Sequence, residues 1–314
     1  MSAPVAIVGA GSIGVSWAIV FARAGRSVRL QDPDAARRDA VAGEVAARLD
    51  QLADAGLLAE APGAIAGRVS VVADLAAAVD GAAHVQECAP ERLDLKRELF
   101  ARLDALAAPG TPLASSSSAL TASAFAGDLA GRARCLVVHP ANPPHLLPVV
   151  EVVPAPFTDP AVVDGVVSAL EAVGQSPVVV RREVEGFVFN RLQGAVLREA
   201  YCLVRDGVAS VEDVDRVVRD GLGRRWAFIG PFETADLNTR GGIAAHAERL
   251  GPAYARMGAE RGQDDPWTPD LIADVTAQRR ALLALEDWDE RVAWRDEALI
   301  ALERARRELI GREI

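Results

Sequence analysis

Short apolar runs alternate with amphipathic stretches through the first half of the chain. The apolar runs are flanked by Gly, Pro or polar residues, a pattern typical of strands that are buried on both faces of a sheet. The predicted strands are Val5–Val8, Val28–Leu30, Val69–Val72, His84–Cys88, Pro112–Ala114, Leu136–Val138, Val149–Val153 and Val178–Val180. The predicted helices are Ile13–Ala24, Ala35–Ala55, Leu93–Ala107 and Ala161–Val173. Strands that alternate with helices predict a doubly wound parallel sheet.

The pattern changes after Glu183, where strand-like alternation disappears. Apolar positions there recur with the spacing of helices. The predicted helices are Gly186–Arg205, Val211–Arg219, Ile243–Arg261, Leu271–Leu285 and Asp289–Leu309. We therefore expect two domains, an α/β domain over residues 1–183 and an all-α domain over residues 184–314.

Composition and charge narrow the class of protein. The 314 residues are 50% hydrophobic, and 44 acidic against 34 basic residues give a formal charge of −10. An acidic surface is a poor partner for nucleic acid, so we expect no nucleic-acid binding. Three widely spaced cysteines, Cys88, Cys135 and Cys202, predict buried thiols and no metal site.

The amino terminus carries no positively charged leader. The uncharged run from Pro4 to Ala22 is long enough to imitate a membrane span, but glycines and serines interrupt it. We expect a cytoplasmic protein without a membrane segment.

A glycine motif follows the first predicted strand. Gly9, Gly11 and Gly14, with Ser12 and Ile13 between them, form a GxGxxG sequence that opens a predicted helix. This strand–turn–helix context indicates a Rossmann-type dinucleotide site, in which the helix N-terminus faces the pyrophosphate. A Gly-rich turn that binds no ligand is the alternative.

An acidic residue ends the second predicted strand. Asp32 lies 18 residues after Gly14, where a carboxylate accepts hydrogen bonds from ribose hydroxyls and repels a 2′-phosphate. The predicted cofactor is therefore NAD rather than NADP. Arg29, Arg37 and Arg38 lie close enough in sequence to offset that repulsion.

His139 and Glu151 are candidates for acid–base chemistry. Four prolines lie between them and exclude a helix, so the chain must run from strand to loop to strand. If both strands join one sheet, the carboxylate can orient an imidazole that takes the proton of a substrate hydroxyl. A structural histidine at a strand end is the alternative.

Three further groups of polar residues are candidates. Ser115–Ser118 follow a predicted parallel strand, at the end where α/β proteins bind ligands. A polar turn without a ligand is the alternative interpretation. Asn190, on an otherwise apolar helix face, needs a partner if it is buried. Glu91 and Lys96 begin a helix, where a solvated helix start is an equally good interpretation.

These motifs together resemble the 3-hydroxyacyl-CoA dehydrogenase superfamily, most closely the branch that contains L-gulonate 3-dehydrogenase and lambda-crystallin. The resemblance covers essentially the whole chain. Its most specific segments are His139-Pro140-Ala141-Asn142-Pro143-Pro144, Pro148 to Pro154, Gly186 to Gln193, Gln86 to Glu91, Asp220 to Gly223 and Ala227 to Pro231.

The resemblance implies a role for each candidate. It implies His139 as catalytic base, Glu151 as its partner, and Ser118 and Asn190 as groups that position the reacting oxygen. It also implies Ser12, Ile13, Asp32, Glu91 and Lys96 at the cofactor, and a homodimer formed through the helical domain.

The sequence constrains the identity of the substrate less than it constrains the cofactor or the type of reaction. Relatives that use CoA carry a His-Phe-Phe-Asn-Pro type of segment where this chain has His139-Pro140-Ala141-Asn142-Pro143. Asn142 and Arg225 are substrate-binding candidates. Arg225 is one because a guanidinium binds a small carboxylate bidentately; a surface arginine without such a role is the alternative. We expect NAD-dependent oxidation of the 3-hydroxyl of a small hydroxy acid, with L-gulonate as the leading candidate. The alternatives are a 3-hydroxyacyl-CoA or carnitine-type dehydrogenase, and a nucleotide-binding structural or sensor protein.

Overall fold

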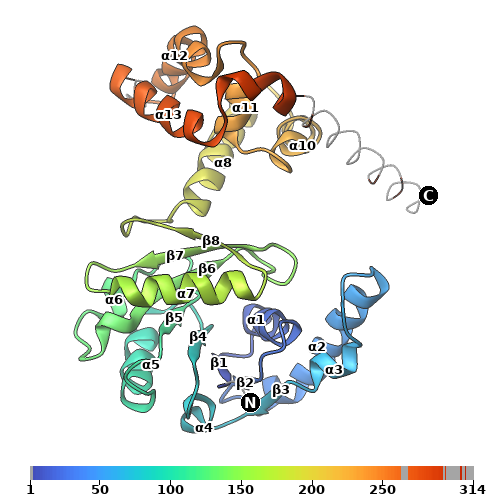
Figure 1. Ribbon diagram of the computed structural model, residues 1–314, viewed down its shortest axis with the longest axis vertical. Helices are drawn as coiled ribbons and strands as arrows, with labels where there is room; N and C mark the ends of the chain where they lie inside the picture. Colours follow the sequence, from blue (N-terminus) through green and yellow to red (C-terminus); the bar gives the residue numbers. More distant parts are fainter. Residues whose placement is uncertain (1–2, 263–267, 293, 295–304, 306–307, 309–314) are drawn as a thin grey trace. The chain divides into compact units, whose positions relative to one another are not determined.

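The fold is taken from a computed structural model that describes residues 3–262 and 268–292, and residues 294, 305 and 308. Internal contacts divide the chain into two units, Met1–Leu197 and Arg198–Ile314 (Figure 1). The division falls inside a helix, later in the chain than residue 183. The boundary at residue 183 stays a prediction.

The first unit is built on an eight-stranded sheet with the order β3-β2-β1-β4-β5-β6-β7-β8. The strands are β1 (Val5–Val8), β2 (Val28–Gln31), β3 (Val69–Val72), β4 (His84–Glu87), β5 (Leu113–Ser115), β6 (Cys135–Pro140), β7 (Val149–Pro154) and β8 (Ser176–Val179). The chain reverses its direction of winding between β1 and β4, the place where doubly wound sheets bind ligands. The predicted fold class, a Rossmann-type sheet followed by a helical domain, is confirmed.

One pair of strands departs from the predicted all-parallel sheet. β6 and β7 are antiparallel, whereas every other neighbouring pair is parallel. The connection between them is the Pro-rich loop 141–148, which contains no helix. A parallel pair needs a long crossover, so this short loop permits only the antiparallel arrangement.

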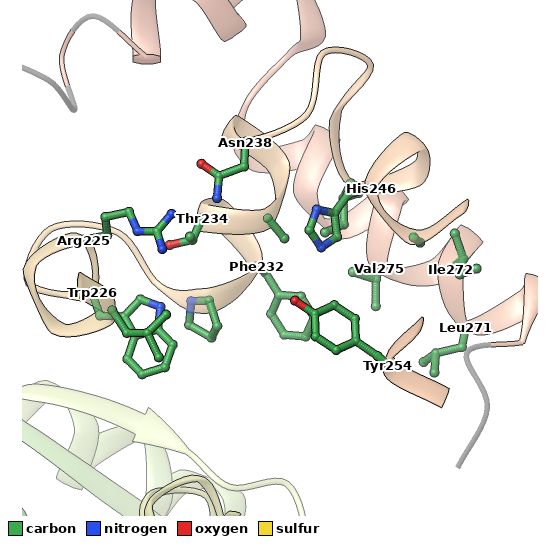
Figure 2. Close-up of a pocket in the computed structure, with 15 residues that line it drawn as sticks. Arg225, Trp226, Phe232, Thr234, Asn238, His246, Tyr254, Leu271, Ile272 and Val275 are labelled. Carbon is green, nitrogen blue, oxygen red and sulfur yellow. The ribbon is translucent and has the colours of Figure 1, made fainter. Parts of the chain in front are cut away.

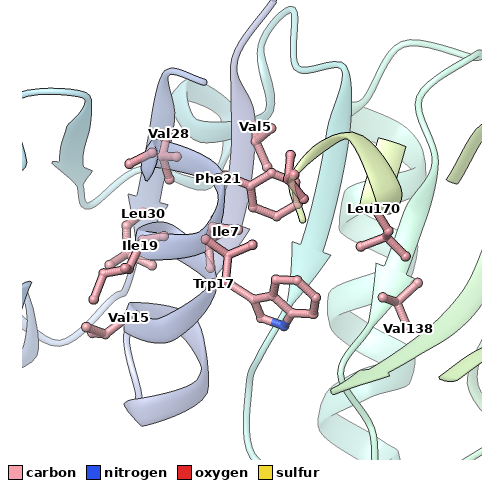
Figure 3. Packing of buried hydrophobic residues seen from close by; sticks show 14 of the residues in the cluster. Val5, Ile7, Val15, Trp17, Ile19, Phe21, Val28, Leu30, Val138 and Leu170 are labelled. Atoms are coloured by element: carbon pink, nitrogen blue, oxygen red, sulfur yellow. The ribbon is translucent and has the colours of Figure 1, made fainter. Parts of the chain in front are cut away.

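Helices cover both faces of the sheet because the strands are apolar on both sides. Ile7 and Val138 belong to a core under α1 (Ser12–Arg23), α2 (Ala35–Asp54) and α7 (Pro160–Ala172) (Figure 3). Their neighbours Val8 and Val137 belong to a second core under α4 (Leu75–Val79), α5 (Leu93–Leu106) and α6 (Ala122–Ala126). Successive side chains of a strand point to opposite faces, which explains how one strand serves both cores.

Differences from the predicted elements are confined to short pieces. The helices α3 (Pro62–Ala66), α4 and α6 were not predicted, because each has five residues and is too short to show a helical period. Of the three cysteines, Cys135 is buried as predicted, but Cys88 and Cys202 are only half-buried. Burial raises the pKa of Cys88 and of Cys135 to about 12, so both remain thiols.

The second unit is helical throughout its described part. It contains the C-terminal end of α8 (Phe189–Arg205), then α9 (Val211–Val217), a π-helix (Val218–Leu222), α10 (Gly223–Trp226), α11 (Pro231–Leu237), α12 (Gly242–Glu260) and α13 (Pro269–Leu282). The short helices α10 and α11 were not predicted. Most of the predicted helix Asp289–Leu309 lies outside the described residues.

Among the described residues, no helix combines the length and the apolar content that crossing a bilayer requires. The uncharged run from Pro4 to Ala22 folds into β1, a turn and most of α1, in agreement with the sequence analysis.

Candidate active site

The glycine turn connects β1 to α1 and has the geometry of a nucleotide cradle. Gly9 has φ +104°, and a Cβ there would lie 2.8 Å from the carbonyl group of Cys88. A Cβ at Gly14 would overlap the carbonyl oxygen of Gly9. Gly11 is different, because a Cβ there would meet no atom within 4 Å. The turn therefore needs Gly9 and Gly14 for its own packing, while Gly11 leaves open space at the start of α1, as a bound pyrophosphate requires.

Ser12 and Ile13 form the first turn of α1. The Ser12 hydroxyl accepts a hydrogen bond from Arg48 of α2 at 3.2 Å, and the Ser12 carbonyl accepts a second from the same guanidinium at 3.1 Å. Ile13 lines the pocket that contains His139. Arg48 thus places a positive charge beside the N-terminus of α1. Arg48 was not predicted as a site residue, because one arginine does not stand out in a sequence rich in arginine.

Asp32 follows β2, and the protein backbone holds its carboxylate. One oxygen accepts a hydrogen bond from the Ala10 amide at 2.8 Å, and the other accepts one from the Asp34 amide at 2.9 Å. A carboxylate oxygen has two lone pairs, so both oxygens can still accept from ribose hydroxyls.

The three nearby arginines bind groups other than the Asp32 carboxylate. Arg37 forms a salt bridge with Glu44 at 2.8 Å, Arg38 donates to the carbonyl of Asp32, and Arg29 donates to the carbonyls of Ala77 and Asp80. None of these contacts is a hydrogen bond to the Asp32 carboxylate, which supports the preference for NAD.

His139 and Glu151 are direct partners across the antiparallel pair β6–β7. Their side chains point to the same face of the sheet, and His139 Nδ1 lies 2.7 Å from Glu151 Oε2. An ionised carboxylate only accepts hydrogen bonds, so Nδ1 must carry the proton of the neutral imidazole. Nε2 therefore bears the lone pair and is the basic atom of the ring.

The backbone before α8 holds the other oxygen of Glu151. Glu151 Oε1 accepts hydrogen bonds from the amides of Val188 at 2.7 Å and Phe189 at 2.9 Å. Burial alone would raise the pKa of Glu151, but the hydrogen bonds from His139, Phe189 and Val188 lower it below the usual range of a glutamate. Phe187, with φ 49°, makes the turn that aims these amides, and its ring lies 5.7 Å from that of His139.

A pocket of about 380 Å³ opens beside His139. It is lined by three further predicted residues, Ser118, Asn142 and Asn190, so the structure brings all three to the histidine. Asn190 Nδ2 donates to the Ser118 carbonyl at 3.0 Å, which ties α8 to the serine loop. Ser116, from the predicted serine run, also lines this pocket. Phe189 and Gln193 line it too, and the sequence analysis assigned no role to either. Neither residue type nor spacing marks these two side chains, because only the fold brings them to the pocket.

Glu91 holds the serine loop, residues 115–118, and the residues after it through hydrogen bonds. Its Oε1 accepts hydrogen bonds from the Ser117 hydroxyl at 2.5 Å and from the amides of Ser118, Ala119 and Leu120. Burial opposes ionisation of Glu91, but these hydrogen bonds and the charge of Lys96 lower the pKa of its carboxyl group.

Lys96 is buried, in contrast to the solvated helix start that was the alternative interpretation. Its ammonium lies 2.9 Å from Glu87 and 3.4 Å from Glu91, and both Lys96 and Glu87 are at most 1% exposed. These contacts place Lys96 under the carboxyl end of β4. Its role at the cofactor stays a prediction.

Arg225 lies in the helical unit and lines a pocket of about 520 Å³ there (Figure 2). Trp226, Phe232 and Tyr254 supply aromatic walls, and Thr234 lies on the same pocket. Among the described residues, the Arg225 guanidinium has no hydrogen-bonding or ionic partner.

The part of the chain that the structure describes contains no cluster of His, Cys, Asp and Glu side chains able to hold a metal ion.

Comparison with known proteins identifies the family. The 3-hydroxyacyl-CoA dehydrogenase NAD binding domain matches residues 4–184, and the C-terminal domain of the same family matches residues 186–281. The chain belongs to the 3-hydroxyacyl-CoA dehydrogenase family. It is thus an NAD-dependent dehydrogenase that acts on a hydroxyl group.

Individual relatives agree with this assignment. The chain is 42% identical to a lambda-crystallin homolog of Bos taurus over 98% of both chains. It is 42% identical to an L-carnitine dehydrogenase of Streptomyces griseus, over 84% of this chain and 76% of the relative. Among solved structures, an NAD⁺-dependent 5-formyl-3-hydroxy-2-methylpyridine 4-carboxylic acid 5-dehydrogenase has a TM-score of 0.74 at 28% identity, over 91% of this chain and 98% of that one.

Proposed function

We propose that this dehydrogenase oxidises the 3-hydroxyl of a small hydroxy acid, with L-gulonate as the leading substrate and 3-dehydro-L-gulonate as the product. The observation that carries the proposal is the His139–Glu151 pair, joined at 2.7 Å beside a pocket with Ser118 and Asn190. When bound, NAD supplies the acceptor for the hydride. The glycine turn, Ser12 and Ile13 would hold it, with Asp32 at its ribose.

The chain's own residues handle the proton. His139 Nε2 is the lone-pair nitrogen of the imidazole, so it accepts the proton of the substrate hydroxyl. Glu151 stays ionised, because its hydrogen bonds lower its pKa. Its negative charge stabilises the imidazolium that forms on His139. The Ser118 hydroxyl and the Asn190 amide, which the Asn190–Ser118 hydrogen bond fixes relative to each other, orient the reacting oxygen.

His139→Ala tests the mechanism. Loss of a general base should lower kcat by roughly 10²–10⁴-fold. Because the cofactor residues are untouched, NADH should bind with unchanged affinity in calorimetry. Wild-type turnover in His139→Ala would reject His139 as the base.

A substrate panel tests the choice of hydroxy acid. With NAD as oxidant, L-gulonate should give a higher kcat/KM than 3-hydroxybutyrate, carnitine or 3-hydroxybutyryl-CoA. A higher value for carnitine or for the CoA ester would move the enzyme to the corresponding dehydrogenase class. Tight NADH binding without turnover of any compound would indicate a structural or sensor protein.

We also propose that Arg225 binds the substrate carboxylate, in cis or from the partner subunit. The support is its place in a pocket with aromatic walls, where the guanidinium has no acidic partner among the described residues. Arg225→Gln should raise KM for gulonate by roughly ten- to a hundredfold, since a charge-assisted hydrogen bond contributes about 1.5–3 kcal/mol. Arg240→Gln is the matched control, because Arg240 is exposed and pairs with Asp289 on the surface. An unchanged KM in Arg225→Gln would exclude the proposed carboxylate contact.

The assembly and the location are proposals as well. We infer a cytoplasmic homodimer that pairs through the helical unit. Large apolar side chains that this unit leaves exposed support the dimer, among them Phe232 at 59%, Met257 at 56% and Tyr254 at 46% exposure.

A further inference from the structure

A chain of three polar side chains leads from the interior of the first unit to the pocket beside His139; the first two are buried and the last is half-buried. It begins at His84, passes through Gln86, and ends at Ser116, the residue after β5. His84 and Gln86 are alternate residues of β4, so both point to the face that α1 covers. Trp17 of α1, whose indole is drawn in Figure 3, reaches the same serine, with Nε1 3.1 Å from Ser116 Oγ.

The contacts of Gln86 fix which way its amide points. One end of the amide lies 3.2 Å from the carbonyl oxygen of Val138 and 2.7 Å from Ser116 Oγ. A carbonyl oxygen only accepts hydrogen bonds, so that end must be the NH₂ group. The amide oxygen therefore faces His84 Nε2 at 3.0 Å. Burial lowers the pKa of His84, so the ring is neutral and carries its proton on Nε2.

The direction of every hydrogen bond at Ser116 follows. The NH₂ group of Gln86 and the indole N–H of Trp17 can only donate. A serine oxygen has two lone pairs and one proton. Both lone pairs are occupied by these two donors, so the Ser116 hydroxyl is left with its own proton and must act as a donor.

Two acceptors compete for that proton. One is Cys88 Sγ, 3.3 Å from Ser116 Oγ. Burial raises the pKa of Cys88 to about 12, so the sulfur is a neutral thiol and a weak acceptor. The other direction is the pocket, which Ser116 lines together with His139 and Ile13. An oxygen bound there is a stronger acceptor than the thiol.

We propose that Ser116 is a dedicated hydrogen-bond donor to a carbonyl-type oxygen bound in the His139 pocket, held in that role by Gln86 and Trp17. Such an oxygen is present in the nicotinamide carboxamide and, as oxidation proceeds, on the reacting carbon of the substrate. The inference rests on the proposed function for the identity of the pocket. It adds a positioning residue from the opposite face of the sheet to the His139–Glu151 pair.

The test compares Ser116→Ala with the wild type, using NADH and its thioamide analogue, thio-NADH, as calorimetric probes. Sulfur accepts hydrogen bonds weakly, so the analogue removes the acceptor from the ligand side. If the nicotinamide carboxamide is the partner, Ser116→Ala weakens NADH binding about three- to tenfold, the effect of one hydrogen bond. Binding of thio-NADH then changes little. If the substrate oxygen is the partner, NADH affinity is retained and kcat/KM for the hydroxy acid falls by a similar factor.

Two variants complete the design. Ser116→Thr keeps the hydroxyl and should retain most of either effect. Ser70→Ala removes a serine hydroxyl from β3, where it donates to the Val28 carbonyl at 3.0 Å, and serves as the matched control.

Two results would overturn the proposal. One is a Ser116→Ala protein that matches Ser70→Ala in both cofactor affinities and in kcat/KM. The other is equal weakening of NADH and thio-NADH binding, which a merely structural serine would cause. If the wild type oxidises no hydroxy acid, the proposed function fails separately. The NADH comparison then decides on Ser116 alone, and an unchanged affinity rejects it.

Discussion

At the scale of single residues, the site depends on groups whose hydrogen-bonding partners leave them one role. Glu151 has one oxygen on His139 and the other on two backbone amides. His139 is thereby left with Nε2 as its basic atom. The same reasoning makes Ser116 a donor, because two donor groups already occupy its lone pairs.

Glu151→Gln should change the pH dependence of the reaction. In the wild type the Glu151 carboxylate stabilises the imidazolium that forms when His139 takes the substrate proton. Its lowered pKa keeps it charged until the pH falls below the usual range of a glutamate, and the stabilisation is lost as the pH drops through that pKa. The variant never carries this charge, so kcat should be lower on the plateau, and the loss of activity in acid that belongs to Glu151 should be absent. A pH profile identical to the wild type would contradict the coupling of the two side chains.

Lys96→Met should lower the free energy of unfolding. The change removes the cation from a buried pair and leaves the Glu87 carboxyl group, whose pKa burial already raises, without its main partner. Breaking a buried ion pair in this way costs about 3–5 kcal/mol. Arg92→Met is the control, because the Arg92–Asp94 pair is 67% and 70% exposed, and an exposed pair contributes at most about 1 kcal/mol. Urea unfolding measures the free energy of unfolding of both variants. Equal losses in the two variants would refute the larger contribution expected of the buried pair.

At the scale of elements, the β1–α1 turn and the β6–β7 pair carry the two halves of the chemistry. The first depends on local geometry, since Gly9 has a positive φ and Gly14 touches Gly9. The second depends on pairing, since His139 lies opposite Glu151 only in the observed antiparallel register. A shift of one residue would send the two side chains to opposite faces.

Two alanine substitutions in the glycine turn should have opposite effects. Gly9→Ala forces a side chain into a positive-φ position against the Cys88 carbonyl, and should cost more than about 1 kcal/mol of stability. Gly11 has φ −68° and ψ −178°, which alanine adopts easily, and open space around it. Gly11→Ala should therefore leave the urea midpoint nearly unchanged but weaken NADH binding in calorimetry. The reverse pattern would mean that Gly11 serves the fold rather than the ligand.

At the scale of the whole molecule, a sheet unit with a cofactor site and a helical unit with its own pocket share one chain. The helical unit leaves the large apolar side chains of Phe232 and Met257 exposed. The proposed homodimer would cover such a surface.

Sedimentation equilibrium should therefore give twice the mass of one chain. Met257→Glu, which places a charge among exposed apolar side chains of the helical unit, should shift the protein toward the monomer. Leu57→Glu is the control, because Leu57 is 58% exposed on the sheet unit. A wild-type protein that sediments as a monomer at micromolar concentration would refute the proposed dimer.

Much of the fold was predictable because its signals are local. The strands β1 and β3 have the predicted limits, and α2 differs by one residue. The antiparallel β7 was not predicted, because direction depends on how the Pro-rich loop closes rather than on the pattern of the strand itself. Helices of five residues, such as α4, were missed because they span little more than one turn.

The candidate site divides in the same way. The glycine motif and Asp32 are recognisable in the sequence, because steric limits on the backbone and a fixed spacing demand those residue types. The pairing of His139 with Glu151, the burial of Lys96 and the donor role of Ser116 required the tertiary structure. These features depend on partners distant in the sequence, and a hydrogen bond or buried charge acquires its meaning only when the fold fixes which atoms it faces and how much water remains around them.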